Sequence, residues 1–320
     1  MNQKIQNPKS KVQSLESADE SQKTDFRSGL VALIGRPNAG KSTLLNRVVG
    51  EKIAAVSNKP QTTRHRIQGV ITRPDGQIVL VDTPGVHKPG YLLNRRMMVA
   101  VHDALASVDL VLLMRDASVS TGNGDKFVLD LVKQAEKPAL LILNKIDKIR
   151  EKTDLLPLIE SYKEEYDWQA VVPVSALKGQ SVDALLREII KHLPVGEALF
   201  DPDELTDQPL RLIASEMVRE KILETTGEEI PYVTAVITEK FDESDPLLTK
   251  IYCAIYVERK SQKAIVIGKA GARIKEIGTR ARHDIANLLG KKVYLELFVK
   301  VEEDWRNRET TLNDLGIRES

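Results

Sequence analysis

Short apolar runs alternate with longer amphipathic segments in the first part of the chain. Runs with the length of buried strands lie at 30–34, 78–81, 110–114, 139–143 and 170–174, and segments long enough for helices lie at 42–49, 94–105, 124–135 and 181–192. Continuous apolar strands that alternate with helices are typical of a parallel sheet with helices on both faces. The pattern therefore predicts a mostly parallel α/β domain over residues 28–193.

The pattern changes on both sides of this domain. Residues 1–27 contain few large apolar side chains and predict a mobile, disordered tail, and residues 194–209 contain three prolines and five acids without periodicity and predict a linker. Residues 210–303 predict an α+β domain with a helix at 211–226, strands at 232–239 and 250–258, a short helix, a glycine-containing turn, a long helix at 272–289 and a strand at 293–301. Residues 304–320 form a C-terminal segment.

Composition excludes several classes of protein. Hydrophobic residues make up 42% and charged residues 29% of the chain, as in ordinary globular proteins, and 47 Lys and Arg against 46 Asp and Glu leave a net charge of only +1. The single cysteine, Cys253, cannot form an internal disulfide. No apolar run approaches the roughly 20 residues that a membrane span needs. One charge, Arg115, interrupts an apolar strand end, so its side chain must reach water or a carboxylate.

The first glycine-rich turn carries a phosphate-binding motif. The sequence GRPNAGKS at 35–42 fits G-x-x-x-x-G-K-[ST] and lies between a predicted strand and a predicted helix, the context that the motif requires. Glycines let backbone N–H groups face a polyphosphate, Lys41 can reach the β and γ phosphates, and Ser42 can hold Mg²⁺. We expect this phosphate loop to comprise Gly35, Arg36, Pro37, Asn38, Ala39, Gly40, Lys41, Ser42 and Thr43.

Polar segments follow three further strands. After the second strand come Asp82, Thr83, Pro84, Gly85 and Val86; after the fourth come Asn144, Lys145, Ile146 and Asp147; after the fifth come Ser175 and Ala176. Asp82 can hold the Mg²⁺ shell through water, and the Gly85 N–H can meet a γ-phosphate. The Asp147 carboxylate can accept hydrogen bonds from guanine N1–H and N2–H₂, which adenine cannot supply. The sequence therefore predicts GTP as the nucleotide.

Taken in order, GRPNAGKS, TTR, DTPG, NKID and SALKG resemble the motifs of translation-factor-related GTPases. The resemblance implies that Lys145 packs its stem on the base, that the Ala176 backbone faces guanine O6, and that Thr63, more readily than Thr62, closes over Mg²⁺ in switch I. A plain surface loop remains the alternative for these threonines.

Two residues of these motifs bear on mechanism. Val86 stands where many small GTPases have the glutamine that orients the attacking water, so slow intrinsic hydrolysis and an activating partner are expected. Asn38 resembles the residue that holds K⁺ in potassium-activated relatives, and a loop-shaping asparagine is an equal alternative.

The C-terminal domain carries a G-x-x-G loop with basic flanks. We expect RNA contacts from Gly268, Lys269, Ala270, Gly271, Arg273 and Lys275. Residues 261–300 hold nine Lys or Arg against three Asp or Glu, whereas residues 207–260 hold seven against eleven, so the basic charge surrounds this loop. The element order resembles the type II KH fold, which implies binding of single-stranded RNA. A KH-like module that docks protein is the alternative.

A GTPase domain followed by a type II KH domain resembles the bacterial Era GTPases over residues 27–317. The resemblance implies a monomeric cytoplasmic factor, also found peripherally at the inner membrane, that assists maturation of the small ribosomal subunit. Its KH domain would bind the 3′ end of small-subunit ribosomal RNA, and the GTP state would favour that binding. The alternatives are a membrane-peripheral or cell-cycle switch whose KH domain docks protein, and an RNA-binding module with a degenerate GTPase domain.

Overall fold

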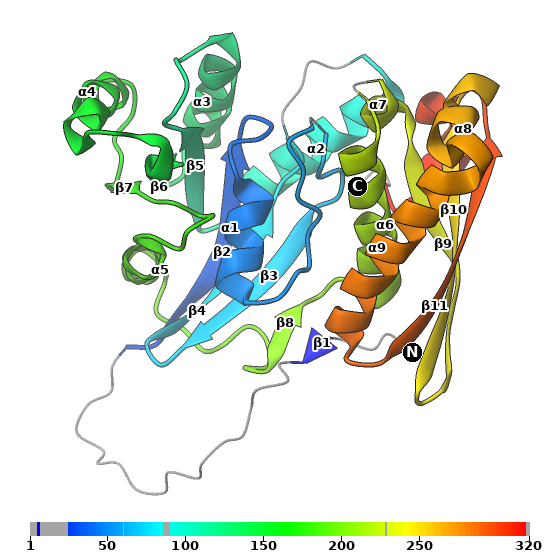
Figure 1. Ribbon diagram of the computed structural model, residues 1–320. Coiled ribbons are helices and arrows are strands. Elements are labelled where there is room, and N and C mark those ends of the chain that lie inside the picture. Colours follow the sequence, from blue (N-terminus) through cyan, green and yellow to red (C-terminus); the bar gives the residue numbers. More distant parts are fainter. Residues whose placement is uncertain (1–4, 7–24, 60, 86–89, 228, 318–320) are drawn as a thin grey trace, which may run out of the picture. The chain divides into compact units, whose positions relative to one another are not determined.

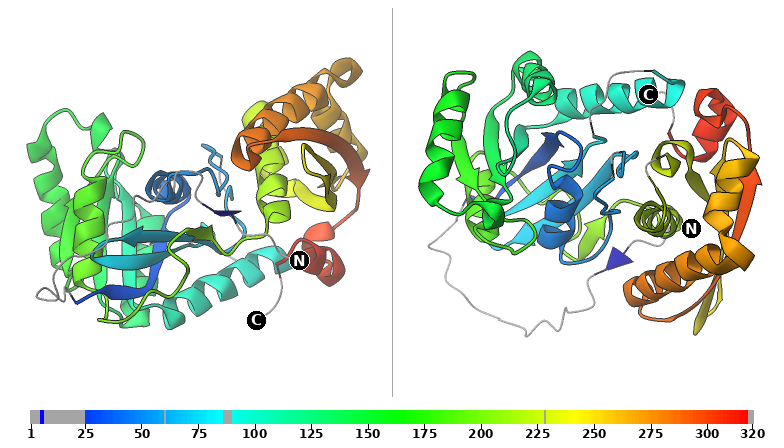
Figure 2. Two further views of the ribbon diagram at one scale, coloured as in Figure 1. Left: turned by 90° about the horizontal axis from the view of Figure 1, so that it is seen from below. Right: turned by 45° about the horizontal axis from the view of Figure 1, so that its top comes forward.

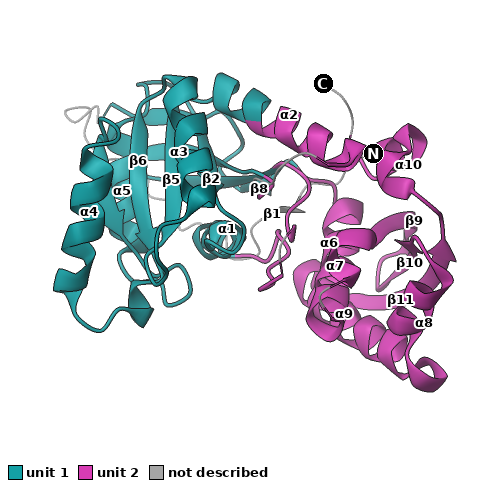
Figure 3. Ribbon diagram, turned by 90° about the horizontal axis from the view of Figure 1, so that it is seen from above, with its two compact units in different colours: residues 1–50, 67–83, 102–207 teal, residues 51–66, 84–101, 208–320 magenta. Residues whose placement is uncertain are grey.

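The computed structural model describes residues 5–6, 25–59, 61–85, 90–227 and 229–317 of the chain (Figure 1). Contacts within the chain divide it into two compact units, which Figure 3 shows in teal and magenta. Unit 1 comprises residues 1–50, 67–83 and 102–207, and unit 2 comprises residues 51–66, 84–101 and 208–320. Two segments near the predicted nucleotide motifs are thus grouped with the C-terminal unit. This division differs from the linear domain boundaries expected from the sequence, which stay a prediction.

Unit 1 is built on a six-stranded sheet with the strand order β3-β4-β2-β5-β6-β7. The strands are β2 (Arg27–Gly35), β3 (Ile67–Arg73), β4 (Gly76–Asp82), β5 (Leu110–Asp116), β6 (Ala139–Asn144) and β7 (Ala170–Pro173). All neighbouring pairs are parallel except β3 and β4, which are antiparallel. The prediction of a mostly parallel α/β sheet is confirmed, with β3 as the strand that the sequence pattern did not indicate.

Helices lie on both faces of this sheet (Figure 2). They are α1 (Lys41–Val49), the last part of α2 (Leu92–Ser107), of which residues 102–107 belong to this unit, α3 (Asn123–Ala135), α4 (Leu156–Lys163) and α5 (Val182–Lys191), with short 3₁₀ turns η1 (Ile146–Lys148) and η2 (Lys152–Leu155). In α5, the apolar residues recur at i, i+3, i+4, i+7 and i+8 and are all buried, which is why this segment packs as a helix. The unit therefore has the three layers that the alternating sequence pattern predicts.

The expected linker carries a short strand, β8 (Glu204–Thr206), which pairs antiparallel with β1 (Ile5–Gln6) in the expected N-terminal tail. Hydrogen bonds to the sheet at Gln77 and Gln68 explain why this aperiodic stretch is ordered. The Gln77 carboxamide accepts hydrogen bonds from the backbone N–H of Leu199 at 2.7 Å and of Phe200 at 2.9 Å. The Thr206 hydroxyl donates to the Gln68 carbonyl at 2.5 Å. Backbone anchoring of this kind has no signature in hydrophobic periodicity.

Unit 2 contains a three-stranded sheet with the order β11-β10-β9. Its elements are α6 (Leu210–Thr225), α7 (Ile230–Val233), β9 (Ala235–Asp245), β10 (Leu248–Val257), α8 (Lys260–Ile267), the 3₁₀ turn η3 (Lys269–Gly271), α9 (Ala272–Leu289), β11 (Lys292–Val301), the 3₁₀ turn η4 (Trp305–Asn307) and α10 (Glu309–Asp314). β10 pairs parallel with β11 and antiparallel with β9. The helices α6 and α9 lie side by side over the sheet (Figure 1). The α+β prediction is confirmed, and the strand expected from residue 232 starts at Ala235 because the short helix α7 precedes it.

The C-terminal segment is packed into unit 2 rather than extending from it. Trp305 is fully buried and donates its indole N–H to the Val233 carbonyl at 2.9 Å. Leu312 and Ile317 join Trp305 in one apolar cluster with Leu93, a residue of the first turn of α2. This cluster explains why residues 84–101 belong to unit 2.

Candidate functional site

The phosphate loop of unit 1 closes around the Lys41 ammonium. The Nζ atom donates to the Gly35 carbonyl at 3.0 Å and lies 3.4 Å from the Arg36 carbonyl. Burial lowers the pKa of Lys41, and the charge of Asp82 opposes this shift. Gly40 has φ +106°, and a Cβ atom there would lie 2.2 Å from Nδ2 of Asn144. The loop therefore needs glycine at this position for both its backbone angle and its space.

Two of the three predicted metal ligands meet in unit 1. The Ser42 hydroxyl donates to Oδ2 of Asp82 at 2.7 Å, so that a hydroxyl and a carboxylate lie beside the phosphate loop. Oxygen atoms of these types are the ligands that Mg²⁺ prefers, so the residues present fit this ion. Thr63, the third predicted ligand, belongs to unit 2 with Thr62, Pro84 and Gly85. Val86 lies outside the described residues.

The predicted base-binding residues converge at the carboxyl ends of β6 and β7. The Asn144 carboxamide donates to the Ala39 carbonyl at 2.7 Å and accepts from the Ala176 N–H at 3.0 Å, and thereby joins the phosphate loop to the loop after β7. The Ser175 hydroxyl donates to Oδ1 of Asp147 at 2.5 Å. Ile146 lies in the 3₁₀ turn η1 between these groups. A carboxylate held in this way can accept two donors from the edge of a guanine.

Two residues that the sequence analysis did not single out hold this region in place. Asp116, at the end of β5, pairs with the Lys145 ammonium at 2.7 Å. Burial raises the pKa of Asp116, but hydrogen bonds from Lys145 and Ser118 outweigh this, so its pKa lies below the ordinary value. From α1, Arg47 donates to the Ala176 carbonyl at 3.3 Å. The position of Asp116 as the polar last residue of a buried strand was the available signal, whereas Arg47 had none.

Asp125 neutralises the buried charge of Arg115. Its carboxylate lies 3.3 Å from Nε of Arg115 and 2.8 Å from Nη1 of Arg36 in the phosphate loop. It also accepts the Gly122 N–H at 2.9 Å and so caps α3. The expectation that Arg115 finds a carboxylate is confirmed, and the same carboxylate fixes Arg36.

The G-x-x-G loop of unit 2 joins α8 to α9. Gly268 has φ +75° and ψ 177°, Ala270 has φ +48° and Gly271 has φ +78°, so three of its four residues have positive φ. Lys269 is exposed, as is Lys275 in the first turn of α9. Arg273 instead donates its guanidinium to the Ile265 carbonyl at the end of α8. The loop thus presents two basic side chains close to two glycines, whose backbone is not covered by a side chain.

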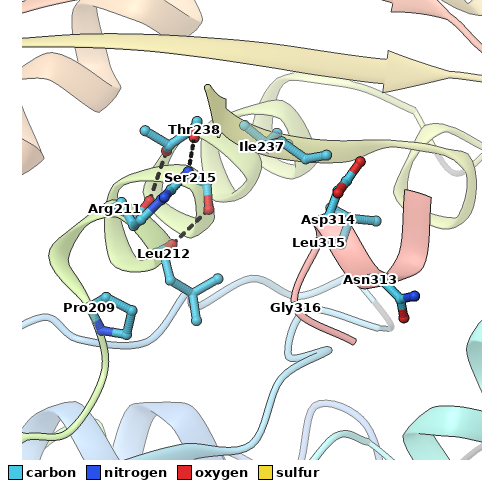
Figure 4. A pocket seen from close by; sticks show the side chains of 11 residues that line it. Pro209, Arg211, Leu212, Ser215, Ile237, Thr238, Asn313, Asp314, Leu315 and Gly316 are labelled. Carbon is cyan, nitrogen blue, oxygen red and sulfur yellow. Dashed lines mark hydrogen bonds between the residues drawn. The ribbon is translucent and has the colours of Figure 1, made fainter. Parts of the chain in front are cut away.

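A cavity of about 370 Å³ lies elsewhere in unit 2, among α6, β9 and the residues after α10 (Figure 4). Arg211 donates to the Thr238 carbonyl at 2.7 Å, and the Thr238 hydroxyl donates back to the Arg211 carbonyl at 2.8 Å. Arg211 and Thr238 are thus engaged with each other rather than directed at a ligand. None of the predicted RNA-binding residues lines this cavity.

Comparison with known proteins decides the family. Residues 30–145 match the model of the 50S ribosome-binding GTPase family, and residues 229–306 match that of the KH domain. The GTPase Era of Staphylococcus haemolyticus is 45% identical over 296 residues, which cover 92% of this chain and 99% of that protein. The chain belongs to the Era family of GTPases.

Two crystal structures of Era proteins show the same two-part fold. One is Era in complex with MgGDPNP and nucleotides 1506–1542 of 16S ribosomal RNA, with 41% identity and a TM-score of 0.88. The other is a point variant of Aquifex aeolicus Era bound to GDP.AlF4-, with 40% identity and a TM-score of 0.88. Each match covers 92% of this chain and 100% of the solved chain. The predicted fold class and family are confirmed. Among the residues that the structure describes, none of the helices could cross a membrane.

Proposed function

We propose that this Era-family GTPase binds and hydrolyses GTP and, through its KH domain, binds the 3′ end of small-subunit ribosomal RNA to assist maturation of the small ribosomal subunit. The observation that carries the nucleotide half is Asn144, which ties the phosphate loop to the loop after β7 while Ser175 holds Asp147 nearby. The solved Era complex with MgGDPNP and 16S ribosomal RNA supports both halves.

In this proposal, each part of the nucleotide has its own residues. Lys41 stabilises the β and γ phosphates, because a buried ammonium among backbone carbonyls gains from an added anion. Asp147 selects guanine by accepting from N1–H and N2–H₂. Ser42, Asp82 through a water, and Thr63 would hold Mg²⁺, which when bound neutralises charge on the phosphates. Slow intrinsic hydrolysis due to Val86, an activating partner, and K⁺ near Asn38 stay predictions.

On the RNA side, the glycines at 268 and 271 let the sugar-phosphate chain approach the backbone, and Lys269 and Lys275 neutralise its charge. Arg273 then acts chiefly by holding the Ile265 carbonyl, which keeps the loop in shape. The RNA in the solved Era complex favours this function over a switch whose KH domain docks protein. A monomeric state, a cytoplasmic location and peripheral association with the inner membrane are further parts of the proposal.

The test is crosslinking of the protein to cellular RNA, with sequencing of the bound fragments in the presence of a GTP analogue or GDP. We expect a peak at the 3′ end of small-subunit ribosomal RNA that is stronger with the analogue. Lys269→Glu combined with Lys275→Glu should remove this peak, and Lys250→Glu on β10 should keep it, because Lys250 is an exposed lysine outside the loop. If no RNA peak appears in either nucleotide state, the RNA function is wrong and a docking switch becomes the better hypothesis.

A further inference from the structure

Within unit 2, the segment 51–66 that contains Thr62 and Thr63 is bound to α6 by a buried arginine. The Arg219 guanidinium donates to the Gln61 carbonyl at 3.1 Å and also to the Thr62 carbonyl. Arg219 is only 1% exposed, and Glu216 on the same helix compensates its charge through a 2.9 Å hydrogen bond to Nε. The two carbonyls directly before Thr63 are therefore fixed by a charged group of the helix that opens the C-terminal unit.

A second attachment lies at the other end of the same segment. Glu220, the neighbour of Arg219 on α6, accepts the Val56 N–H at 2.7 Å and the Lys52 ammonium at 2.5 Å. Lys52 also pairs with Asp284 on α9 at 2.7 Å. Lys221 lies 2.8 Å from Glu220 and 2.9 Å from Asp284, so both carboxylates keep a cation even without Lys52.

A third attachment is made by Arg64, directly after Thr63. It donates to the carbonyls of Thr234 and Pro231, each at 2.7 Å, and its guanidinium lies 5.6 Å from the centre of the Trp305 ring. Arg64 is 3% exposed. Thr63 is thus flanked on both sides by residues whose backbone or side chain is hydrogen-bonded to the C-terminal part of unit 2.

The helix α9 connects these contacts to the predicted RNA site. It starts at Ala272, directly after the G-x-x-G loop, and reaches Asp284 about 18 Å further along its axis at 1.5 Å per residue. The helix α6 packs against α9. A displacement of residues 51–66 must therefore break or move bonds on α6 and on α9, the helix whose first turn directly follows the RNA-binding loop.

We infer that Arg219 is a positioning residue that couples the nucleotide state to RNA affinity, by tying the backbone before Thr63 to α6. The inference rests on the proposed function, in which Thr63 holds Mg²⁺, and the family resemblance implies that Thr63 does so when the γ-phosphate is present. A ligand that displaces Thr63 changes the free energy of the hydrogen bonds between Arg219 and the backbone before Thr63. An RNA that displaces α9 changes the free energy of the same hydrogen bonds, because α9 packs against α6. Coupling of this kind is reciprocal, so each ligand changes the affinity of the other by the same factor.

The test measures the ratio of RNA dissociation constants with GDP and with a GTP analogue, using a labelled single-stranded RNA of the small-subunit 3′ end. For the wild type we expect a ratio of about fivefold or more in favour of the analogue. The double variant Glu216→Gln with Arg219→Gln removes this buried ion pair as a unit, and its ratio should fall to about twofold, because the Lys52 and Arg64 attachments remain. Arg211→Gln is the matched control on α6, because the Arg211 side chain donates to the Thr238 carbonyl, away from residues 51–66, and its ratio should stay at the wild-type value.

A second pair of variants distinguishes loss of coupling from a general folding defect. Lys52→Ala should lower the ratio by about twofold, since it removes one attachment while Lys221 still neutralises both carboxylates. Lys59→Ala is its control, because its ammonium forms no ion pair with a described residue, and it should leave the ratio unchanged. A variant that merely loosens the unit would weaken RNA binding equally in both nucleotide states.

The outcomes separate the two proposals. A wild type that binds RNA with a ratio well above one, with an unchanged ratio in the Arg219 and Lys52 variants, overturns the coupling role alone. A wild type that binds this RNA with a ratio of one also overturns the coupling and leaves RNA binding standing, whereas a wild type that does not bind this RNA overturns the proposed function together with the coupling that rests on it.

Discussion

Replacing Gly268 by alanine tests the shape of the RNA-binding loop with a single methyl group. Gly268 has φ +75° and ψ 177°, a combination that is found almost only for glycine. A Cβ atom there would lie 2.7 Å from Cβ and 3.0 Å from the backbone N of Arg273, in the first turn of α9. Because a helix backbone cannot shift cheaply, the substitution adds a steric conflict to the backbone strain. The loop should leave its present conformation.

The magnitude follows from these two terms. A residue other than glycine in this backbone region costs on the order of 1–3 kcal/mol, and the contact at 2.7 Å puts Gly268→Ala at the upper end, about 3 kcal/mol. If RNA binds the present conformation, its affinity falls by roughly 100-fold. Gly271→Ala is the matched control, because φ is +78° but no heavy atom lies within 4 Å of the added Cβ. Its cost of about 1 kcal/mol predicts a loss of about fivefold.

The assay is fluorescence anisotropy with a labelled single-stranded RNA, in the presence of a GTP analogue. Affinity for a fluorescent guanine nucleotide should be unchanged in both variants, since both residues lie outside unit 1. Gly268→Asp and Gly271→Asp add negative charge next to phosphate and should both abolish RNA binding. The reasoning is refuted if Gly268→Ala binds RNA as the wild type does, or if the two alanine variants lose equal affinity.

Three further predictions concern single side chains. Asp147→Asn should shift the nucleotide preference from guanine toward xanthine in competition binding, since an amide donates where a carboxylate only accepts, and an unchanged preference for GTP would contradict the base contact. Asp116→Ala should speed guanine nucleotide release by about tenfold, because Lys145 loses a charge-assisted hydrogen bond, and stopped-flow release at the wild-type rate would exclude this role. Burial lowers the pKa of His65, and the charge of Glu216 opposes this shift. As the pH falls below the ordinary value of 6.5, the unfolded chain therefore takes up a proton before the folded chain does. The free energy of unfolding that His65 contributes above pH 6.5 is then lost. Melting temperatures at pH 7.5 and 5.5 should therefore differ more in the wild type than in His65→Gln, and equal differences would be evidence against a buried neutral imidazole.

Much of the fold could be predicted because buried strands, and helices that end at glycines, leave clear patterns of apolar and glycine positions in the sequence. The helix predicted at 272–289 is observed with the same limits, since Gly271 and Gly290, both with left-handed backbone angles, end it on either side. β3 was missed because Gln68, Gly69 and Thr72 interrupt its apolar run, although most of the strand is buried. Pairing with β4 stabilises β3 as a strand, and strand pairing cannot be recognised from the local sequence pattern.

The residues of the candidate sites also differ in whether the sequence alone could predict them. Residues that carry chemistry within a motif could be predicted, because the motif places them at the end of a strand or at the start of a helix. Asp116 stands at the end of a buried strand, but its pairing with Lys145 depends on which loops the fold brings together, and Arg47 has no local signal at all. Arg219 stands more than 150 positions from Gln61, and its hydrogen bond to that carbonyl is a tertiary contact that only the folded chain shows.

The division of the chain into units bears on how a nucleotide switch works here. The phosphate loop, Asp82, Asn144 and Asp147 all belong to unit 1, and these are the residues predicted to hold the parts that GTP and GDP share. Thr63 and Gly85, which are predicted to respond to the γ-phosphate, belong to unit 2 together with the KH elements. Hydrolysis would then leave the base contacts of unit 1 intact and remove the γ-phosphate both from Lys41 of unit 1 and from two segments that are grouped with the RNA-binding unit. If Thr63 responds to the γ-phosphate as predicted, such a chain needs no separate relay between nucleotide and RNA, because the segment that contains Thr63 is bonded to α9 through the ion pair of Lys52 with Asp284.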